Sequence, residues 1–408
     1  MKVCICSEYF APDMGSTGKV LYELAAQLAE THPDLQLEVV SSDRQYRSAH
    51  DAKQEELEGV SVSRLRTLKL NRDVPAQRLF GDLLFSLSVF FYFLFRKKPD
   101  VILVVTNPFV LPLAPWLLKR FFKVPYLYLI HDLYPDIALV VGVTSENSAM
   151  TKIFRRLQRQ WLNAADRVIV LGRCMQDVIM RNYNVADDRI AVITNWADHE
   201  TIQPLTKNTK DTPFRVKHGL CGFMALYSGN LGLFHDFDTM LDAAKRLKQV
   251  KPEITVVIVG EGRAKEYIAH RIETEALCNV RLLPLVPEGE LVELLSSADV
   301  SVVTLSSGAE GLAVPLKFYN ILAVARPVIA VMSPSSEISR VLAEHECGIQ
   351  VDQGDVENFI GAVTSLAAVQ ERTATMGQNA RRALEQEFTL AHVVAKYHDL
   401  LKEITASR

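Results

Sequence analysis

The segment 306–320 combines residue types that suit the binding of a phosphorylated ligand. A loop of small residues around Glu310 leads to Pro315, a residue favoured in the first turn of a helix, and Lys317 follows within that turn. A lysine there is unfavourable for the helix dipole. A bound anion would interact favourably with the free amides, the dipole and the ammonium together. We therefore expect a diphosphate at this helix end, with Asn320 one turn further on. The alternative is a solvated lysine on a surface helix.

Two glycine-containing turns are further candidates for phosphate binding. The first turn contains Gly15, and the second contains Gly229 and Asn230 and precedes His235. Glycine lets the backbone approach a ligand closely, and the helix predicted after each turn offers free N–H donors. Neither turn has GxGxxG spacing, so an ordinary strand-to-helix turn is the alternative in both cases.

His131 and Asp132 follow an apolar strand predicted over 126–130. At the carboxyl end of a parallel strand, His131 is expected to face the same crevice as the Gly15 turn. The alternative is a histidine that only makes structural hydrogen bonds. The sequence has no HExxH, Walker A or DxD-type motif in a convincing context, so we expect no metal and no cofactor beyond the substrate.

Strand-like runs alternate with helical ones along most of the chain, which predicts an α/β fold with parallel sheets and crossover helices. A polar stretch without periodicity separates two such series between about 198 and 212. Two doubly wound, Rossmann-like halves in tandem are the simplest account. The expected strands are 2–7, 37–41, 101–106, 126–131, 167–171, 190–193, 223–228, 254–260, 279–283, 300–304 and 328–330, with only helices after the last.

Composition is that of a globular protein, with 49% hydrophobic residues, 23% charged residues and a net charge of −3, which gives no argument for nucleic-acid binding. The six cysteines form no CxxC pair, which favours buried thiols and a reducing cytoplasm. The longest apolar run, 83–95, falls short of the roughly 20 residues that span a bilayer. It is interpreted either as a core helix or as an interfacial helix with Arg96, Lys97 and Lys98 at anionic lipid.

These loops, in this order, resemble the GT-B retaining glycosyltransferases of family four, over essentially the whole chain. The matching segments include 8–12, 193–198 and 259–262, and 388–390 precedes a last helix similar to the one that returns to the first domain in this family. The segments 131–136, 314–317 and 326–330 are similar to those of bacterial transferases that make O-antigen, colanic acid or capsule. The chain departs from the family pattern at Asn320, where a second glutamate is usual, and at Asn230 and His235, where arginine and lysine are common.

The resemblance implies two domains facing each other across a cleft. Residues 1–200, joined by the C-terminal helix 389–408, would form the acceptor domain, and residues 201–388 would form the nucleotide-sugar donor domain. It implies transfer of a hexose or N-acetylhexosamine from a UDP-sugar, such as UDP-glucose, to a saccharide acceptor, lipid-linked at the inner face of the cytoplasmic membrane in one interpretation. The reaction would retain the anomeric configuration and need no metal.

The resemblance also implies a role for each candidate residue. The base would lie near Arg263 and the backbone of Leu285 and Val286, and Asn320 would meet the ribose. The diphosphate would lie over Gly15, Gly229 and the helix that carries Lys317, beside Asn230 and His235. Glu310 and the amides of Gly311 and Leu312 would hold the sugar, which His131 would face from the first domain.

Three other functions fit parts of the same pattern. A GT-B epimerase acting on a UDP-sugar shares the architecture but needs no acceptor. A nicotinamide-dependent dehydrogenase would want GxGxxG after a strand and an acidic residue about 20 positions on, and no loop satisfies both. A non-catalytic protein that binds the nucleotide sugar is the third alternative, favoured by Asn320 and His235.

Overall fold

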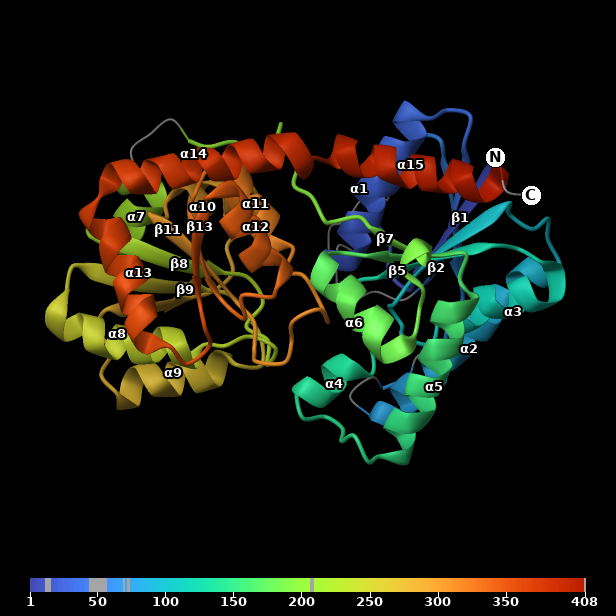
Figure 1. Cartoon of the computed structure of the whole chain (residues 1–408), viewed down its shortest axis with the longest axis horizontal. Helices are drawn as coiled ribbons and strands as arrows, with labels where there is room; N and C mark the ends of the chain where they lie inside the picture. Colours follow the sequence, from blue (N-terminus) through green and yellow to red (C-terminus); the bar gives the residue numbers. More distant parts are fainter. Residues whose placement is uncertain (12–15, 44–56, 69, 72–73, 206–208, 407–408) are drawn as a thin grey trace. The chain divides into compact units, whose positions relative to one another are not determined.

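The computed structural model describes the 408-residue chain except for residues 12–15, 44–56, 69, 72–73, 206–208 and 407–408. The chain divides into two compact units (Figure 1). Unit 1 comprises Met1–Leu139, Thr144–Thr194 and Leu390–Arg408, and unit 2 comprises Val140–Val143 and Asn195–Thr389.

Unit 1 is built on a parallel sheet of seven strands in the order β3-β2-β1-β4-β5-β6-β7. Its central strands are runs of apolar residues that are buried throughout, as in sheets covered on both faces. The order reverses direction between β1 and β4, which places a topological switch point there. The strands are β1 Lys2–Cys6, β2 Gln36–Ser42, β3 Val60–Leu65, β4 Val101–Val105, β5 Tyr126–Ile130, β6 Arg167–Val170 and β7 Ile190–Val192.

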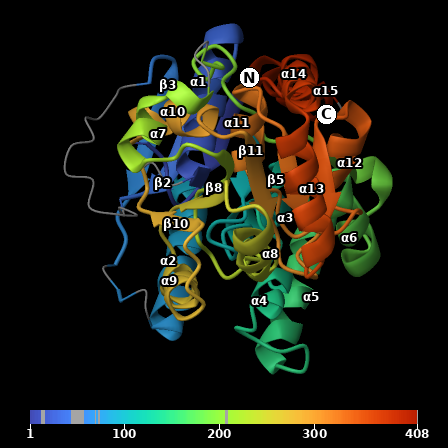
Figure 2. The same ribbon diagram turned by 90° about the vertical axis from the view of Figure 1, so that its left-hand side faces the viewer.

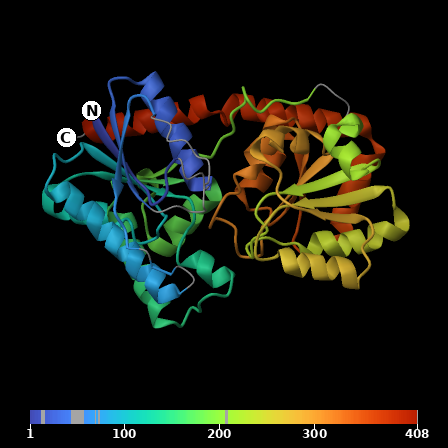
Figure 3. The same cartoon turned by 180° about the vertical axis from the view of Figure 1, so that it is seen from behind.

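The described helices of unit 1 cover both faces of this sheet (Figures 1 and 3). On one face α15 packs against α1, and on the other α3 contacts both α2 and α5. These helices are α1 Ser16–Thr31, α2 Pro75–Leu94, α3 Leu113–Phe122, α4 Asp136–Val140, α5 Ala149–Ala164, α6 Arg173–Tyr183 and α15 Leu390–Ala406, with the 3-10 turn η1 Asp187–Arg189.

Helix α2 is longer than the apolar run 83–95 suggested, because it begins at Pro75, a residue suited to a first turn. Among the described residues it is the one helix that passes a length-and-hydropathy test for a membrane span, with 20 residues and a mean hydropathy of 1.2, a test that buried core helices also pass. One face, including Phe85, Val89 and Phe93, is buried in unit 1. Phe80 and Phe91 project from other faces and are exposed.

Unit 2 is built on a parallel sheet of six strands in the order β10-β9-β8-β11-β12-β13. Helices α8, α9 and α13, which are labelled in Figure 2, share one hydrophobic core with alternate residues of β8, β9, β11 and β12. Helix α11 packs on α14 and β11, and α12 packs on β12 and α14. The strands are β8 Phe223–Ser228, β9 Ile254–Val259, β10 Val280–Leu283, β11 Val300–Thr304, β12 Val328–Val331 and β13 Gly348–Val351.

The described helices of unit 2 follow the crossover pattern that the sequence predicts, except near the end of the chain. After β12 the sequence predicted only helices, and this was wrong: the four residues of β13 pair in parallel with β12. The helices are α7 Pro213–His218, α8 Asp238–Val250, α9 Lys265–Thr274, α10 Leu291–Ser296, α11 Lys317–Ala323, α12 Glu337–His345, α13 Val356–Ala368 and α14 Gln370–Glu387, with the 3-10 turns η2 Thr209–Asp211 and η3 Glu288–Glu290.

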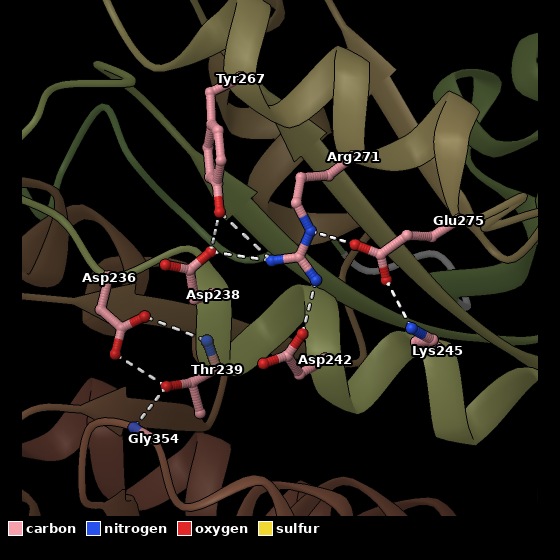
Figure 4. A network of polar contacts seen from close by, with 9 residues as sticks. All are labelled: Asp236, Asp238, Thr239, Asp242, Lys245, Tyr267, Arg271, Glu275 and Gly354. Carbon is pink, nitrogen blue, oxygen red and sulfur yellow. Dashed lines mark hydrogen bonds and ion pairs between the residues drawn. The ribbon is translucent and has the colours of Figure 1, made fainter.

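A network of charged groups joins α8 to α9 (Figure 4). Arg271 on α9 donates to Asp238 at 2.9 Å and to Asp242 at 2.5 Å, both on α8, and it also pairs with Glu275. Hydrogen bonds to Glu275 and the neighbouring carboxylates raise the pKa of the Arg271 guanidinium, which stays charged. The network fixes α9, and with it the loop that precedes α9.

Candidate functional site

The carboxyl edge of the unit 2 sheet brings most of the predicted residues together. The strand order reverses between β8 and β11, and in open α/β sheets ligands bind beyond the carboxyl ends of the strands at such a point. The loops after these two strands are joined directly: the Ser306 N–H donates to the Phe234 carbonyl at 3.0 Å. The loop after β9 is tied to the loop after β8, because the Leu231 N–H donates to the Glu261 carbonyl at 2.8 Å.

Lys317 is the first residue of α11, and its ammonium lies at this switch point. The Nζ atom is buried and contacts no hydrogen-bond partner among the described residues. It lies 3.8 Å from the centroid of the Tyr227 ring, a cation–π contact worth up to about 2 kcal/mol when desolvated. Burial lowers the pKa of Lys317 to about 7, so the positive charge of this ammonium is incompletely stabilised by the protein. The sequence left a solvated surface lysine as the alternative, and the buried Nζ atom excludes it.

Gly229 directly follows β8 and lies beside this ammonium. A Cβ atom at this position would lie 3.0 Å from Lys317 Nζ and 3.1 Å from its Cε. The backbone of Gly229 has φ +133°, a conformation that side-chain-bearing residues rarely adopt. Only a glycine therefore allows the lysine to lie against the turn.

His235 closes the same loop as a neutral side chain. Its Nδ1 lies 2.7 Å from the carbonyl oxygen of Thr304 at the end of β11. Burial, followed by the nearby charge of Lys317, lowers the pKa of His235 to about 3. The histidine therefore adds a hydrogen-bonding group to the site and no charge, which leaves Lys317 as the cation of this cluster.

The loops after β9 and β10 form the part of the edge expected to bind the base. Asn230 lies against Gly262, where a Cβ would stand 2.8 Å from the Asn230 Oδ1. Arg263 follows and is exposed. Leu285 is 45% exposed and Val286 is half-buried, and their loop is tied to the loop after β9 by a Gly260 N–H donated to the Leu283 carbonyl at 3.0 Å.

Glu310 lies in the loop after β11 and is oriented from a neighbouring loop. The Gln353 side-chain amide donates to Glu310 Oε1 at 3.0 Å and to the Leu305 carbonyl at 3.1 Å. Gly311 and Leu312, which follow it, are buried. Asn320 is half-buried on α11, one turn after Lys317.

His131 belongs to unit 1, at the carboxyl end of β5. Its backbone N–H and that of Asp132 both donate to Thr106 Oγ1, at 3.1 and 3.3 Å, so the residue following β4 orients this turn. His131 Nε2 is buried with no partner among the described residues, and burial lowers its pKa to about 4. The side chain is neutral and free to bind a ligand group. Gly15 lies outside the described residues.

Sequence reasoning missed three residues that position the site: Tyr227 beneath Lys317, Gln353 beside Glu310 and Thr106 beneath His131. Tyr227 lies two residues before Gly229, but the sequence does not reveal that a residue 90 positions later would lie on its ring. Gln353 and Thr106 carry no motif. No residue group suited to a metal is found at this edge among those described.

Comparison with known families separates the chain into two matched regions. Residues 15–196 match the family described as glycosyl transferase 4-like domain, and residues 212–383 match glycosyl transferases group 1. The two regions together cover most of the chain.

Individual relatives and a solved structure agree with this match. The chain is 27% identical over 295 residues to the probable glycosyltransferase WbjE of Pseudomonas aeruginosa, covering 72% of each chain. It is 24% identical to the putative colanic acid biosynthesis glycosyl transferase WcaI of Escherichia coli, over 97% and 99% of the two chains. The crystal structure of Anabaena HepE in complex with UDP has a similar fold, with a TM-score of 0.75 and 15% sequence identity. The match covers 99% of this chain and 100% of the HepE chain. HepE has also been solved with UDP-glucose.

Proposed function

Because the chain belongs to the glycosyltransferases that join a glycosyl transferase 4-like domain to a group 1 domain, with the GT-B fold expected from its sequence, we propose that it is a retaining hexosyltransferase. The donor is a UDP-sugar, and the acceptor is a saccharide in polysaccharide biosynthesis. Unit 2 binds the donor and unit 1 the acceptor. The observation that carries the proposal is the buried ammonium of Lys317, which lies against Gly229 at the switch point of the donor unit and has no hydrogen-bond partner in the part of the chain that the structure describes.

A diphosphate at this point compensates the buried charge. The negative charge of the diphosphate raises the pKa of Lys317 from about 7, so the lysine is protonated in the complex. A neutral ligand would leave the amine partly deprotonated. The Gly229 turn allows phosphate oxygens close to the backbone. The base lies against Arg263, Leu285 and Val286, and the ribose contacts Asn320. The sugar is held by Glu310 and by the backbone amides of Gly311 and Leu312.

During transfer, the bond between the anomeric carbon and the diphosphate oxygen breaks, and the electron pair stays on the diphosphate. Lys317 stabilises this developing negative charge, which is the largest electrostatic task of the reaction. The acceptor hydroxyl oxygen bonds to the anomeric carbon from the side of the leaving group, and its proton passes to the diphosphate. The configuration is retained, and His131 from unit 1 contacts the sugar as a neutral hydrogen-bonding group. The proposal requires no metal ion.

The test replaces Lys317 while keeping its packing on Tyr227. Lys317→Met should lower kcat for transfer from UDP-glucose by about 10²–10³-fold, the loss seen when one donor to a developing oxyanion is removed. Lys217→Met, at an exposed lysine of the same unit, is the matched control and should retain activity. Unchanged turnover in Lys317→Met would overturn the assignment. Conversion of the UDP-sugar without an acceptor would instead identify an epimerase.

We propose further that unit 1 contacts the membrane that carries a lipid-linked acceptor. Phe91 and Phe95 are 51% and 82% exposed at the end of α2, and Phe121 on α3 is 63% exposed. Basic residues adjoin them: Arg96 lies over the Tyr92 ring, and Lys98 lies 4.3 Å from the centroid of the Phe122 ring. Exposed aromatic residues beside cations suit the interface of an anionic bilayer.

Vesicle sedimentation tests this contact. Each basic residue near an anionic surface contributes about 1 kcal/mol, so Arg96→Gln, Lys97→Gln and Lys98→Gln together should greatly weaken binding to anionic vesicles. Phe91→Ser with Phe95→Ser should weaken it independently of salt. Binding that is unchanged in both variants, or equal on zwitterionic vesicles, would contradict the membrane contact and leave the transferase proposal intact.

A further inference from the structure

Two histidines and an aspartate that play no part in the proposed reaction come together within unit 1. His32 directly follows α1, Asp34 lies two residues later in the turn before β2, and His398 lies on α15. The turn has a fixed backbone: the His32 N–H donates to the Leu28 carbonyl, and the Leu35 N–H donates to the His32 carbonyl, both at 3.0 Å. Since α15 packs on α1, the three side chains meet across these two helices.

The three groups present ligand atoms at close range. One atom from each of His32, Asp34 and His398 lies within 4.8 Å of the others. The two imidazole rings are stacked, with centroids 3.4 Å apart and planes 7° apart. Asp34 is exposed and His32 half-buried, so these two side chains are free to adjust.

His398 is the residue that points to a missing ligand. It is 7% exposed, and its Nε2 is buried with no hydrogen-bond partner among the described residues. Buried polar atoms are nearly always satisfied, and a site for a bound ion is one of the few explanations for an exception. A stack of two rings leaves this nitrogen unsatisfied, whereas coordination would use its lone pair.

The charged groups around the pair bear on whether a cation can bind. Lys402 and Asp399 on α15 act on His398 electrostatically, as does Asp34. A histidine binds a metal as the neutral imidazole. The positive charge of Lys402 works against a second cation, and the carboxylate of Asp34 offsets it.

We propose that His32, Asp34 and His398 form a binding site for one divalent transition-metal ion of the Zn²⁺ type, which joins α15 to the end of α1. Two imidazoles and a carboxylate, with water in the fourth position, are a ligand set that Zn²⁺ accepts. Because the lone pairs of stacked rings run nearly parallel, the ring of His32 turns out of the stack so that both nitrogens converge on the ion. The site shares no residue with the donor site and is independent of the proposed function.

The experiment uses the untagged, metal-stripped full chain. Titration with Zn²⁺ against a chromophoric competitor should show one tight equivalent per chain, and Co²⁺ should give the visible absorption of a low-symmetry site with nitrogen ligands. Asp34→Asn changes an exposed side chain by one atom and should weaken Zn²⁺ binding at least about tenfold, since even the loss of an outer partner costs 10–100-fold. His32→Gln should do the same, and His398→Gln should abolish the tight equivalent.

The matched control is His392→Gln, at an exposed histidine of the same helix, which should bind Zn²⁺ as the wild type does. Zn²⁺ should also raise the Tm of the wild type and the control but not of Asp34→Asn, because a ligand that binds only the folded chain stabilises it. The proposal is wrong if the wild type binds no stoichiometric Zn²⁺. It is equally wrong if Asp34→Asn and His32→Gln, folded by circular dichroism, bind as tightly as the control.

Discussion

Lys317 illustrates how the structure holds a charge ready for an anion. The ammonium is removed from water and rests on the Tyr227 ring, but no carboxylate among the described residues neutralises it. His235 is kept neutral beside it. A second buried cation beside Lys317 would add electrostatic repulsion, whereas one lysine with a lowered pKa can lose its proton until the ligand binds.

Donor binding should therefore depend on pH with a definite sign. The pKa of Lys317 is about 7 in the free protein and rises when a diphosphate binds, so affinity for UDP-glucose should fall above pH 7, by up to about tenfold per pH unit. UDP-glucose is the suitable probe because its diphosphate does not titrate in this range. Calorimetry between pH 6 and 9 measures the effect, and Lys317→Met should show no such fall.

The stability of the ligand-free protein should change in the opposite direction. Between the folded pKa of about 7 and the ordinary value of 10.5, the unfolded chain binds the Lys317 proton and the folded chain does not. The free energy of unfolding contributed by this group therefore rises with pH across that window. Urea titrations of the wild type and of Lys317→Met measure this contribution as the difference between their free energies of unfolding at each pH. A difference that falls with pH would show that the amine is not buried as described.

Replacing Gly229 with alanine should damage both folding and activity. The added Cβ would meet Lys317 Nζ at 3.0 Å, and φ +133° is strained for any side-chain-bearing residue, at a cost of about 1–3 kcal/mol. Displacement of the ammonium should lower kcat/KM by tenfold or more. This loss is smaller than the one expected for Lys317→Met, because the ammonium is moved and not removed. Gly219→Ala is the control, since φ is +64° there but no atom of the neighbouring described residues lies within 4 Å of the new Cβ. Equal kinetics in the two variants would contradict a role for the close approach.

At the scale of elements, the sequence predicts best where a strand is buried on both faces. The runs that became β4, β5 and β9 are short, almost wholly apolar and rich in β-branched or aromatic residues, and this length and composition favour a strand over a helix. Strand β3 was missed because Val60–Leu65 alternates with serines and, at the sheet edge, has no buried residue. Strand β13 was missed because four residues beginning with glycine give no periodicity, and its parallel pairing with β12 is what stabilises it.

The same limit applies to the candidate site. The loops were predictable, because polar and glycine residues after buried strands must lie at the carboxyl edge of a parallel sheet. The side-chain contacts between these loops could not be predicted. The interactions of Lys317 with Tyr227 and of Gln353 with Glu310 join loops from different strands, and they depend on side-chain packing that leaves no spacing in the sequence.

The network that joins α8 to α9 should contribute to both stability and donor binding (Figure 4). Arg271→Met keeps the aliphatic stem but removes the ion pairs with Asp238 and Asp242. Exposed pairs are weak, so we expect a loss of about 1 kcal/mol that shrinks at high salt. Since α9 follows the loop that carries Arg263, the KM for UDP-glucose should rise more than kcat falls. Arg246→Met, in an exposed pair with Glu357 on the same unit, should leave KM unchanged.

At the scale of the whole molecule, the two units are folded by different stretches of chain. Unit 1 takes its last helix from the C-terminus, so that residues at opposite ends of the sequence share one core. Unit 2 is built from a nearly continuous segment, ending where Thr389 pairs with Ala197. Loss of the C-terminal helix should therefore act on the first unit and spare the second.

A chain ended at Thr389 tests this assignment. Removing α15 strips from unit 1 the buried side chains of Val393, Val394, Tyr397, Leu400, Leu401 and Ile404. Burial of each is worth about 1.5–3 kcal/mol, so their total is comparable to the whole stability of most domains, about 5–15 kcal/mol. Hydrogen exchange should show protection lost in β1 and α1 and kept in β8 and β9, while UDP-glucose still binds with an affinity within tenfold of the full chain and transfer is abolished. Matched deletion of Thr405–Arg408 alone, which removes no residue of that buried set, should leave both units protected. If protection in β8 were lost with that in β1, the two units would fold as one, and donor binding could not be attributed to unit 2 alone.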